Sequence, residues 1–297
     1  FMACKGRHTP LGFKIQKEEI QMRNLKRALS LALAAIMLIG MMVVSASAAS
    51  YNDLTDKDQI VNKDAVSMLV SLGIIEGKPD GSYGPTENVD RAQMAKMLSV
   101  IMNKGVDNSA LYQSVNSGLT DITSHWAKGH INYCYTTGII AGGGNGKFDP
   151  SATVTALEAA KMLLVAVGYD PAIEGFEGAD WAINVSVRAD EQGIFEGFTK
   201  DLSAPLNRDD AALLIYNALD VEMIQSYTTN NYPIAYSDHR TILADKYGVI
   251  KVEGVVTANE WAILDDDTDT ALQEGKTRIY NPDGILSTTG NTAVAQD

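Results

Sequence analysis

Apolar residues recur at helical spacing between residues 51 and 221, in two kinds of segment that alternate three times along the chain. In the second kind, the apolar positions are Met94, Met97, Leu98 and Ile101; Ala159, Met162, Leu163 and Ala166; and Ala211, Leu214, Ile215 and Leu219. In the first kind they are Val61, Ala65, Leu69 and Leu72, and then Trp126, Ile131, Cys134 and Tyr135. Positions three and four residues apart share one face of a helix, so the pattern predicts a mainly α region built from paired helices.

A five-residue turn separates the two helices of each pair. It runs glycine, isoleucine, isoleucine or phenylalanine, any residue, glycine, at 73–77, 138–142 and 193–197. Glycine just after a helix tolerates the left-handed conformation, and we expect the isoleucine that follows to pack back onto the helix. The second helix then opens with a capping box in every copy, namely Asp90 with Gln93, Thr155 with Glu158, and Asn207 with Asp210.

The three copies stay in register when they are aligned on these turns. A proline follows the first glycine by the same interval in each copy, at Pro85, Pro150 and Pro205. A Leu-Thr-Asp triplet precedes the first two copies and closes on Asp56 and Asp121, whereas Phe176 stands at this position in the third. A unit this small cannot bury its own apolar face, so we expect the three helix pairs to close around a shared core.

A leader is expected ahead of the repeats. From Met22 a short basic stretch is followed by an uncharged apolar run at 28–44 and by small residues at 45–49. This order predicts a secretory signal peptide at 22–48, with an uncleaved membrane anchor as the alternative. A signal peptide begins at the start of a chain, so residues 1–21 are interpreted as a non-native upstream segment.

Charge narrows the choice of partners. The segment before Ala49 holds 7 of the 24 basic and 2 of the 37 acidic residues, which leaves 17 basic and 35 acidic residues and a net charge of −18. Such acidity argues against nucleic acid as a partner. Cys134 would be the only cysteine left, so an intrachain disulfide is excluded in the exported chain. We expect no membrane span after cleavage of the signal.

The composition changes after the repeats. Residues 222–245, rich in threonine, asparagine and tyrosine around 227–236, are predicted to form a linker. Residues 246–297 are predicted to be a partial β-rich region, with strands within 247–257, 260–264 and 276–280 and a turn at 281–284. This region is short for a complete β domain, so we expect the full product to continue further.

These features resemble the S-layer homology domain. The matching pieces are residues 119–121 and 125–127, the three glycine-bounded turns, and the helix starts at 89–93, 154–158 and 206–210. The resemblance covers about 170 residues and implies three helix-loop-helix repeats, at 51–105, 116–170 and 176–221, in a pseudo-threefold bundle. It also implies a function, because such domains hold exported proteins non-covalently on bacterial cell-wall polysaccharide, which is often pyruvylated.

From this resemblance we expect an exported S-layer-type protein, secreted to the cell wall of a Gram-positive-type bacterium. The expected partner is an anionic cell-wall polysaccharide, with like subunits of a surface lattice as a further candidate. We expect no enzymatic activity, no cofactor and no metal. The rival interpretations are the anchor of a larger surface enzyme, such as a polysaccharide hydrolase whose catalytic domain lies beyond Asp297, and an envelope receptor that uses the repeats as a tether.

Two arginines are the main candidates for contact with the polymer. Arg91 and Arg208 stand at the first position of a helix, where unpaired N–H groups already make the end positive. Helix N–H groups and a guanidinium together suit a carboxylate such as a ketal-linked pyruvate, which agrees with the role that the resemblance implies. The alternative is a weak surface pair with Asp90 or Asp209, worth about 0–1 kcal/mol. Ala156 stands at this position in the second copy, so we expect one or two working sites.

Trp126 and Trp181 are candidates for stacking on sugar faces, and equally for packing into the core as helix residues.

Asp121 and His125 are candidates for the edge of a binding groove, and for Asp121 the equal alternative is capping of the helix that contains Trp126. Asp56, Gly77 and Gly142 complete the expected carbohydrate-binding set.

Overall fold

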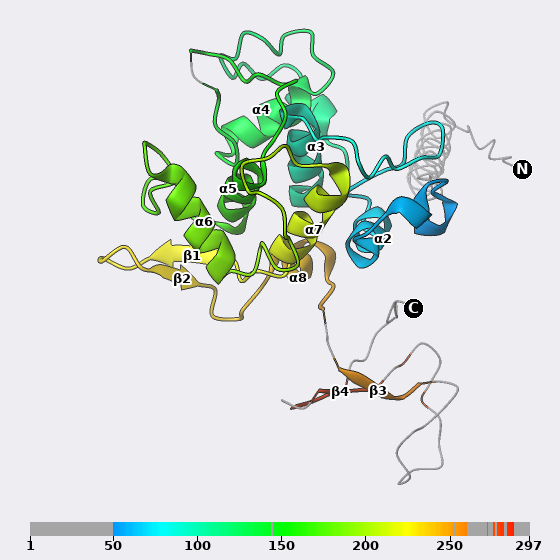
Figure 1. The fold of residues 1–297 in the computed structure, drawn as a ribbon. Coiled ribbons are helices and arrows are strands. Elements are labelled where there is room, and N and C mark those ends of the chain that lie inside the picture. The colour runs from blue at the N-terminus through cyan, green and yellow to red at the C-terminus, as the bar shows by residue number, and fades with distance from the viewer. Residues whose placement is uncertain are drawn as a thin grey trace, which may run out of the picture. The chain divides into compact units, whose positions relative to one another are not determined.

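A computed structural model describes residues 50–143, 145–251, 254–259, 272, 276, 278–281 and 284–287 (Figure 1). The predicted upstream segment and signal peptide lie outside the described residues. The α-helices are α2 (Lys63–Ser71), α3 (Arg91–Met102), α4 (Lys128–Thr136), α5 (Ala156–Val167), α6 (Trp181–Glu191), α7 (Arg208–Ala218) and α8 (Ile242–Tyr247). Short 3-10 helices lie at η1 (Tyr51–Asp53), η2 (Lys57–Gln59) and η3 (Ser109–Tyr112). The fold is therefore mostly helical, as predicted.

The helices follow one another along the chain as three pairs, and each first helix packs on a helix of another pair. The pairs are α2 with α3, α4 with α5, and α6 with α7. The first helix of each pair packs on the second helix of the pair before it, so that α4 lies on α3 and α6 lies on α5. In the same way α2 packs on α7, which brings the two ends of the repeat region together. The three pairs therefore form a closed ring.

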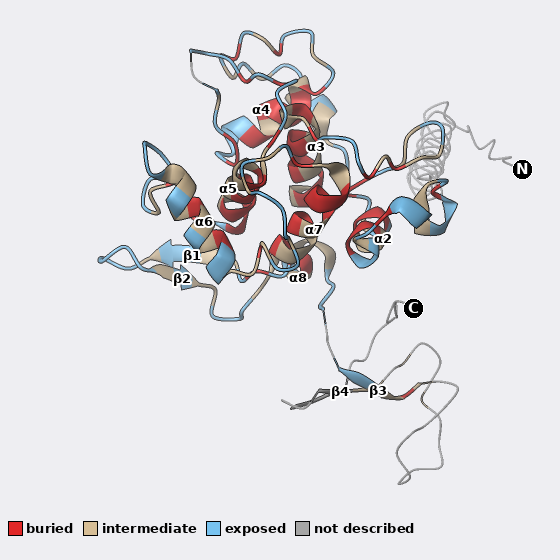
Figure 2. Ribbon diagram, viewed as in Figure 1, coloured by how far each residue is buried: buried red, intermediate tan, exposed pale blue. Residues whose placement is uncertain are grey.

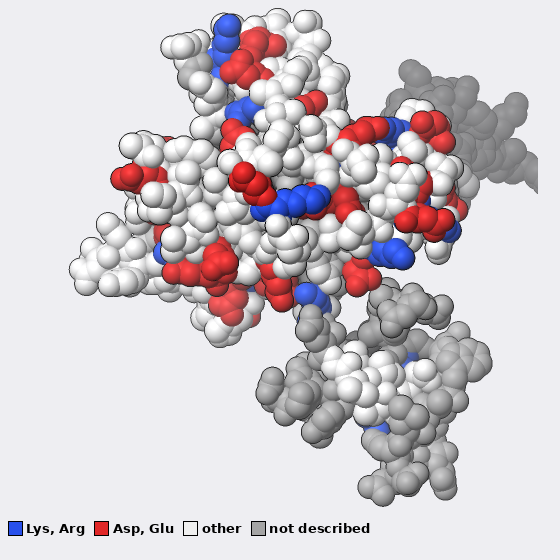
Figure 3. All heavy atoms as spheres, in the orientation of Figure 1, with Lys and Arg blue, Asp and Glu red and all other residues white. Residues whose placement is uncertain are grey.

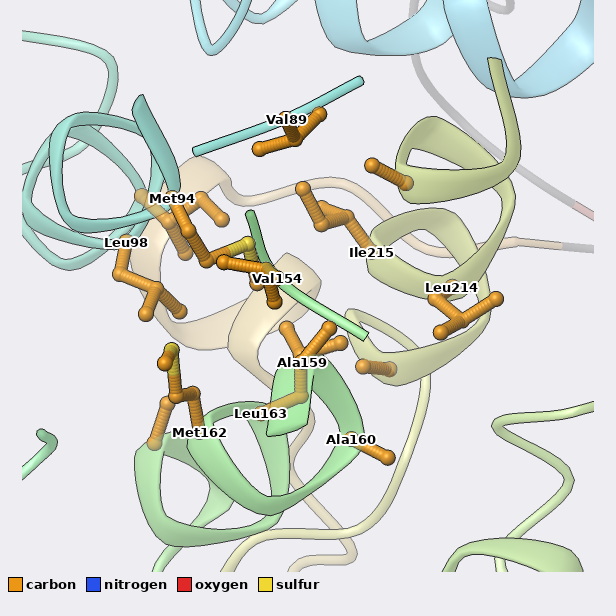
Figure 4. Packing of buried hydrophobic residues seen from close by; sticks show 14 of the residues in the cluster. Val89, Met94, Leu98, Val154, Ala159, Ala160, Met162, Leu163, Leu214 and Ile215 are labelled. Carbon is orange, nitrogen blue, oxygen red and sulfur yellow. The ribbon is translucent and has the colours of Figure 1, made fainter. Parts of the chain in front are cut away.

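Three short extended segments meet at the centre of this ring. The N–H of Val89 donates to the carbonyl of Leu206 at 2.8 Å, Leu206 donates to Val154 at 2.8 Å, and Val154 donates to Val89 at 2.9 Å. All three side chains are buried. Figure 4 shows Val89 and Val154 at this point, between the side chains of α3, α5 and α7.

The core lies between the second helices of the pairs. Met94 and Leu98 come from α3, Ala159 and Leu163 from α5, and Ile215 from α7, and they gather in one cluster (Figure 4). Figure 2 shows buried residues on these three helices, and also on α2 and α4. The shared core that the repeat predicts is therefore present.

The predicted helix ends are confirmed in all three copies. Gly73, Gly138 and Gly193 have φ values of +69°, +78° and +69°. In each copy the isoleucine that follows donates its N–H at 2.9 Å to a carbonyl in the last turn of the preceding helix, those of Leu69, Cys134 and Ala189. This 6→1 bond is the Schellman motif, and it fixes the direction in which the chain leaves the helix.

The capping boxes are complete at α3 and α5, where the cap and the third residue bond each other in both directions. At α7 only half of the box forms. The Asn207 side chain accepts from the N–H of Asp210, while the Asp210 carboxylate pairs with Lys200 instead.

The predicted apolar faces of the first helices are wrong at three positions. Val61 is 82% exposed and Trp126 is 57% exposed. Both precede their helices, since α2 begins at Lys63 and α4 at Lys128, and so neither belongs to the packed stripe. Tyr135 lies within α4 but is also on the exposed side. No helix among the described residues has the length and apolar character needed to span a membrane.

The segment predicted to be a linker is an ordered part of the helical body. Strands β1 (Ile224–Tyr227) and β2 (Pro233–Ala235) form an antiparallel hairpin, and α8 follows. The hairpin lies so close to the end of α5 that a Cβ at Gly168 would be 2.6 Å from the Ile224 carbonyl oxygen. The buried side chains of Ile242 and Leu243 join the core cluster. The polar composition predicted a linker because few residues of this segment are apolar. Those few are nevertheless enough to pack it against the core.

A second antiparallel sheet has the order β3 (Val255–Ala258), β4 (Arg278–Asn281), β5 (Gly284–Ser287). The pairing of Asn281 with Gly284 agrees with the predicted turn at 281–284. The predicted strand at 260–264 lies outside the described residues.

Replacement of Leu243 by alanine tests whether α8 belongs to the folded body. The Leu243 side chain is 1% exposed, so Leu243→Ala should lower the free energy of unfolding by about 2–5 kcal/mol. The matched control is Ile234→Ala in the hairpin, where the side chain is 41% exposed. Urea unfolding of both variants checks this, and equal stabilities would mean that the segment is only a connection.

Candidate functional site

Arg91 and Arg208 make the same set of contacts at two different seams of the ring. Arg91 reaches from α3 to the loop before α5, where its Nε donates to the Phe148 carbonyl at 2.8 Å and its Nη2 to the Ala141 carbonyl at 3.1 Å. Arg208 reaches from α7 to the loop before α3, and donates to the carbonyls of Tyr83 at 2.8 Å and Glu76 at 3.2 Å. Each guanidinium is therefore held in one orientation across a seam between two pairs.

An aromatic ring lies beneath each guanidinium. The Cζ of Arg91 is 4.5 Å from the centroid of the Phe148 ring, and that of Arg208 is 4.7 Å from the Tyr83 ring. The Tyr83 hydroxyl also donates to the Arg208 carbonyl at 2.7 Å. Cation–π contact of this kind orients a guanidinium and leaves its edges available for hydrogen bonds.

Neither aromatic residue is among the predicted site residues, although the repeat places both at the same position of their copies. Phe148 and Tyr83 stand ten residues after the first glycine of their copies, where the third copy has Ser203. Ser203 belongs to the third copy, which is next around the ring after the copy that contains Ala156. An arginine in one copy thus occurs with an aromatic residue in the next.

The two guanidinium groups retain donors beyond these contacts. A guanidinium carries five N–H groups, and the bonds formed among the described residues account for two of them in each arginine. Burial lowers the pKa of Arg91, while the carboxylates of Glu158, Asp149 and Asp121 act to raise it. An arginine remains charged under such conditions, so the site offers a fixed cation.

The prediction that unpaired helix N–H groups assist these arginines is wrong. At α3 the N–H groups of Arg91 and Ala92 donate to carbonyls of the neighbouring copy, those of Ala152 at 2.9 Å and Pro150 at 3.0 Å. The N–H groups of Arg208 and Asp209 do the same at α7. Because the closed ring brings a loop against each helix start, these N–H groups are not available to an anion.

The alternative of a surface pair with the adjacent aspartate does not hold either. The Asp90 carboxylate accepts from the N–H of Gln93 at 2.7 Å. The Asp209 carboxylate is buried and accepts from the backbone of Asn62 at the start of α2. Both carboxylates are therefore engaged with N–H groups rather than with the arginine beside them.

Asp56 and Asp121 hold the loops that the arginines contact. The Asp56 carboxylate accepts from the N–H groups of Tyr83 at 2.7 Å and Gly84 at 2.8 Å. The Asp121 carboxylate accepts from Phe148 at 2.9 Å and from Asp149 at 2.8 Å. Asp121 therefore does not cap the helix near Trp126, and its structural role is to position the loop whose carbonyl binds Arg91.

These bonds also set the acidity of the two carboxyl groups. Burial acts to raise the pKa of Asp121, but the N–H groups of Phe148 and Asp149 outweigh it and hold the pKa below its ordinary value. The pKa of Asp56 is lowered in the same way by Tyr83 and Gly84, against the effect of burial. Both groups therefore favour the ionised form in the folded protein.

Gly77 and Gly142 lie where two segments of the chain approach each other closely. A Cβ at Gly77 would lie 3.1 Å from the Leu54 side chain, and a Cβ at Gly142 would lie 3.0 Å from the Lys147 carbonyl oxygen. This packing accounts for both glycines, while their contact with sugar stays a prediction.

The two tryptophans differ in environment. Trp126 is exposed, with the rings of His125 and His130 at 5.6 and 6.3 Å, so the alternative of a core residue does not hold for it. Trp181 is partly buried against the core, and the Lys161 ammonium lies 5.6 Å from its ring centroid. The Nδ1 of His125 accepts from the N–H of Ala127 at 3.2 Å, at the start of α4.

The third seam lacks the arginine and its partners. The buried Ala156 starts α5, and the next N–H, that of Leu157, donates to the Leu202 carbonyl at 3.1 Å. Phe176, which replaces the aspartate of the triplet, is also buried. The structure therefore brings the predicted arginine, aspartate and glycine together at two seams only.

Comparison with known proteins relates this arrangement to a family. The S-layer homology domain pattern matches residues 50–95 and 118–160, and the third helix pair falls outside these ranges. The chain is 28% identical over 270 residues to the cell surface protein of Thermoanaerobacter kivui, covering 90% of this chain and 32% of the relative. It is 30% identical over 151 residues to the S-layer protein of Bacillus licheniformis, covering 50% of this chain and 16% of the relative.

An amylopullulanase of Thermoanaerobacterium thermosulfurigenes is also similar, with 30% identity over 185 residues, 58% of this chain and 10% of the relative. The chain thus spans about a third or less of the length of these relatives.

The loop-holding role of Asp121 predicts a specific dependence of stability on pH. A lowered pKa in the folded state stabilises the fold above the unfolded pKa, and this contribution is lost as the pH falls through the folded pKa. Asp121→Asn should therefore lower the free energy of unfolding at pH 7 by roughly 1–3 kcal/mol and reduce the loss of stability below about pH 4.

Urea unfolding at several pH values measures this dependence. Asp58→Asn is the control, because Asp58 is exposed and lies near the same triplet in the first copy. A pH profile for Asp121→Asn that coincides with that of the unmodified protein would contradict the assignment.

Proposed function

Because the chain is an S-layer homology domain protein related to S-layer and cell-surface proteins, we propose that it anchors an exported protein to the bacterial cell wall. The observation that carries the proposal is the pair of equivalent arginine sites at two seams of the ring. In this interpretation the three helix pairs are three S-layer homology repeats with pseudo-threefold symmetry. The region is a binding module and not an enzyme.

The ligand that we propose is an anionic cell-wall polysaccharide, with a pyruvate ketal as the recognised group. Each guanidinium lies over an aromatic ring and donates to two carbonyl groups, which fixes its position and leaves further N–H donors for a ligand. A planar fork of N–H donors matches the two oxygens of a carboxylate. Arg91 and Arg208 each supply one such fork, and Ala156 supplies none, so two grooves bind the polymer.

Trp126 is the best candidate for contact with the sugar rings. Its indole is exposed beside His125, and a large exposed aromatic face suits stacking on the apolar face of a sugar. Trp181 is less accessible and contributes less.

The interaction must be local, because the net charge of the exported chain opposes it. Acidic side chains are spread over the face drawn in Figure 3, and the basic groups lie in small separate patches. A chain of charge −18 repels an anionic polymer at long range, and only close contact with a fixed cation overcomes this repulsion.

A second candidate function is the anchor region of a larger surface enzyme. The similarity to an amylopullulanase supports it, since this chain spans only a tenth of that relative. The reading frame beyond Asp297 separates the two candidates. Further β repeats favour a lattice protein whose partners include like subunits, and a long domain with a catalytic site favours the enzyme.

Substitution of the two arginines tests the site. Arg91→Ala and Arg208→Ala should each weaken binding to purified cell-wall polysaccharide in a pull-down by about 10-fold or more, and the double variant should lose binding. The matched control is Arg240→Ala, since Arg240 is half-buried, lies over the Tyr236 ring and pairs with Asp238. Circular dichroism shows whether each variant is folded. Normal binding by a folded double variant would overturn the assignment.

Salt provides an independent test of the local mechanism. Raising NaCl from about 0.05 to about 0.5 M screens the long-range repulsion as well as the attraction, whereas half-buried contacts are screened less. We therefore expect binding to persist at the higher concentration in the same pull-down. Complete release by salt would indicate diffuse attraction in place of a fitted site.

A further inference from the structure

At the seam between the first and third helix pairs, a carboxylate from α7 is buried against the start of α2. Asp209, the second residue of α7, is 5% exposed. Its Oδ1 accepts from the N–H of Asn62 at 3.2 Å, and its Oδ2 accepts from the N–H of Val61 at 3.3 Å and the Asn62 Nδ2 at 3.1 Å. The Asn62 amide also donates to the Asp209 carbonyl at 3.3 Å. One side chain of α7 therefore binds the start of α2.

Of the three first helices, all of which lack a side-chain capping bond, α2 is the one whose start receives this carboxylate. Asn62 stands at the cap position of α2, but its side chain makes no capping bond to the helix. The carboxylate from α7 is held there instead, against N–H groups at the positive end of the helix. The equivalent second residues of α3 and α5 are Ala92 and Leu157, which carry no acceptor in the side chain.

The connectivity of the chain explains the difference between seams. The chain runs from α3 through η3 to α4 and from α5 to α6, so those neighbours are linked covalently. Between α7 and α2 no such link exists, and Asn62 and Asp209 are 147 residues apart in sequence. Non-covalent contacts alone must therefore hold this seam together, whereas the other two seams are also joined by the covalent chain.

The same seam contains a proposed binding group. Arg208 directly precedes Asp209 and reaches the loop of the first pair through the carbonyls of Tyr83 and Glu76. If α2 moved away from α7, that loop would move with it, because Tyr83 and Gly84 are tied to Asp56 just before α2. The contacts that orient Arg208 thus depend on the closure of this seam.

We propose that Asp209 is a positioning residue that fastens α2 to α7, closes the ring, and holds the Arg208 groove in its binding geometry. The part that concerns the groove rests on the proposed function, while the closure of the seam does not. A carboxylate in this place is costly to bury, and the N–H groups at the start of α2 offset that cost. Burial raises the pKa of Asp209, and the N–H groups of Asn62 and Val61 act to lower it.

Amide hydrogen exchange on the full chain tests closure without any ligand. Asp209→Ala should increase the exchange rates of the Val61 and Asn62 amides by roughly 10-fold or more, and Asp209→Asn, which keeps one acceptor oxygen, should increase them less. Asp210→Ala is the matched control, because the adjacent Asp210 is also buried but pairs with Lys200 of its own helix pair. Unchanged exchange in Asp209→Ala would overturn the proposal.

A double-mutant cycle tests the effect on the groove, with purified cell-wall polysaccharide as the probe. In an Arg91→Ala background, where only the Arg208 groove remains, Asp209→Ala should weaken binding by about 10-fold. In an Arg208→Ala background, Asp209→Ala should cause no further loss. Equal losses in both backgrounds would indicate general destabilisation and refute the positioning role. Absence of binding by the unmodified protein would refute the proposed function, and the exchange experiment would still decide the closure.

Discussion

Three backbone hydrogen bonds that join Val89, Val154 and Leu206 in a cycle are the constraint on which the rest of the structure depends. Each residue donates to one neighbour and accepts from the other, so none is fully paired until all three segments have met. Their buried side chains supply the apolar contact that favours this meeting. The packing of α2 on α7 follows, because these helices come from opposite ends of the repeat region and meet only when the three pairs surround one point. Both arginine sites lie at seams that exist only in the closed ring.

Much of the helical fold could be predicted from the repeat. The three glycine turns, the helix starts and the shared core follow from local rules that act in the same way in each copy, as Gly73 and its equivalents show. Errors arose where a residue lies just outside an element. Val61 and Trp126 continue the apolar spacing by one turn, yet the chain is not helical there and both side chains face water. Periodicity gives the face of a helix but fixes its first residue poorly.

The candidate site could be predicted only in part, because its geometry depends on contacts between copies. Arg91 and Arg208 could each be identified from the sequence of their own copy. Their aromatic partners, Phe148 and Tyr83, belong to the next copy around the ring. For the same reason the helix N–H groups seemed unpaired in sequence and are paired in the fold. Asp56 and Asp121 were expected at a groove edge, and the structure shows that they hold the loops from which the arginine contacts come.

The docking of α8 has a mechanical consequence. The N–H of Leu243 in this helix donates to the Leu219 carbonyl at the end of α7, and the Tyr247 hydroxyl donates to the Ile101 carbonyl of α3. Tension applied to the chain beyond Gly248 would therefore act on α3 and α7 together. The load would be shared between the first and last pairs, and α7 would not be peeled away alone.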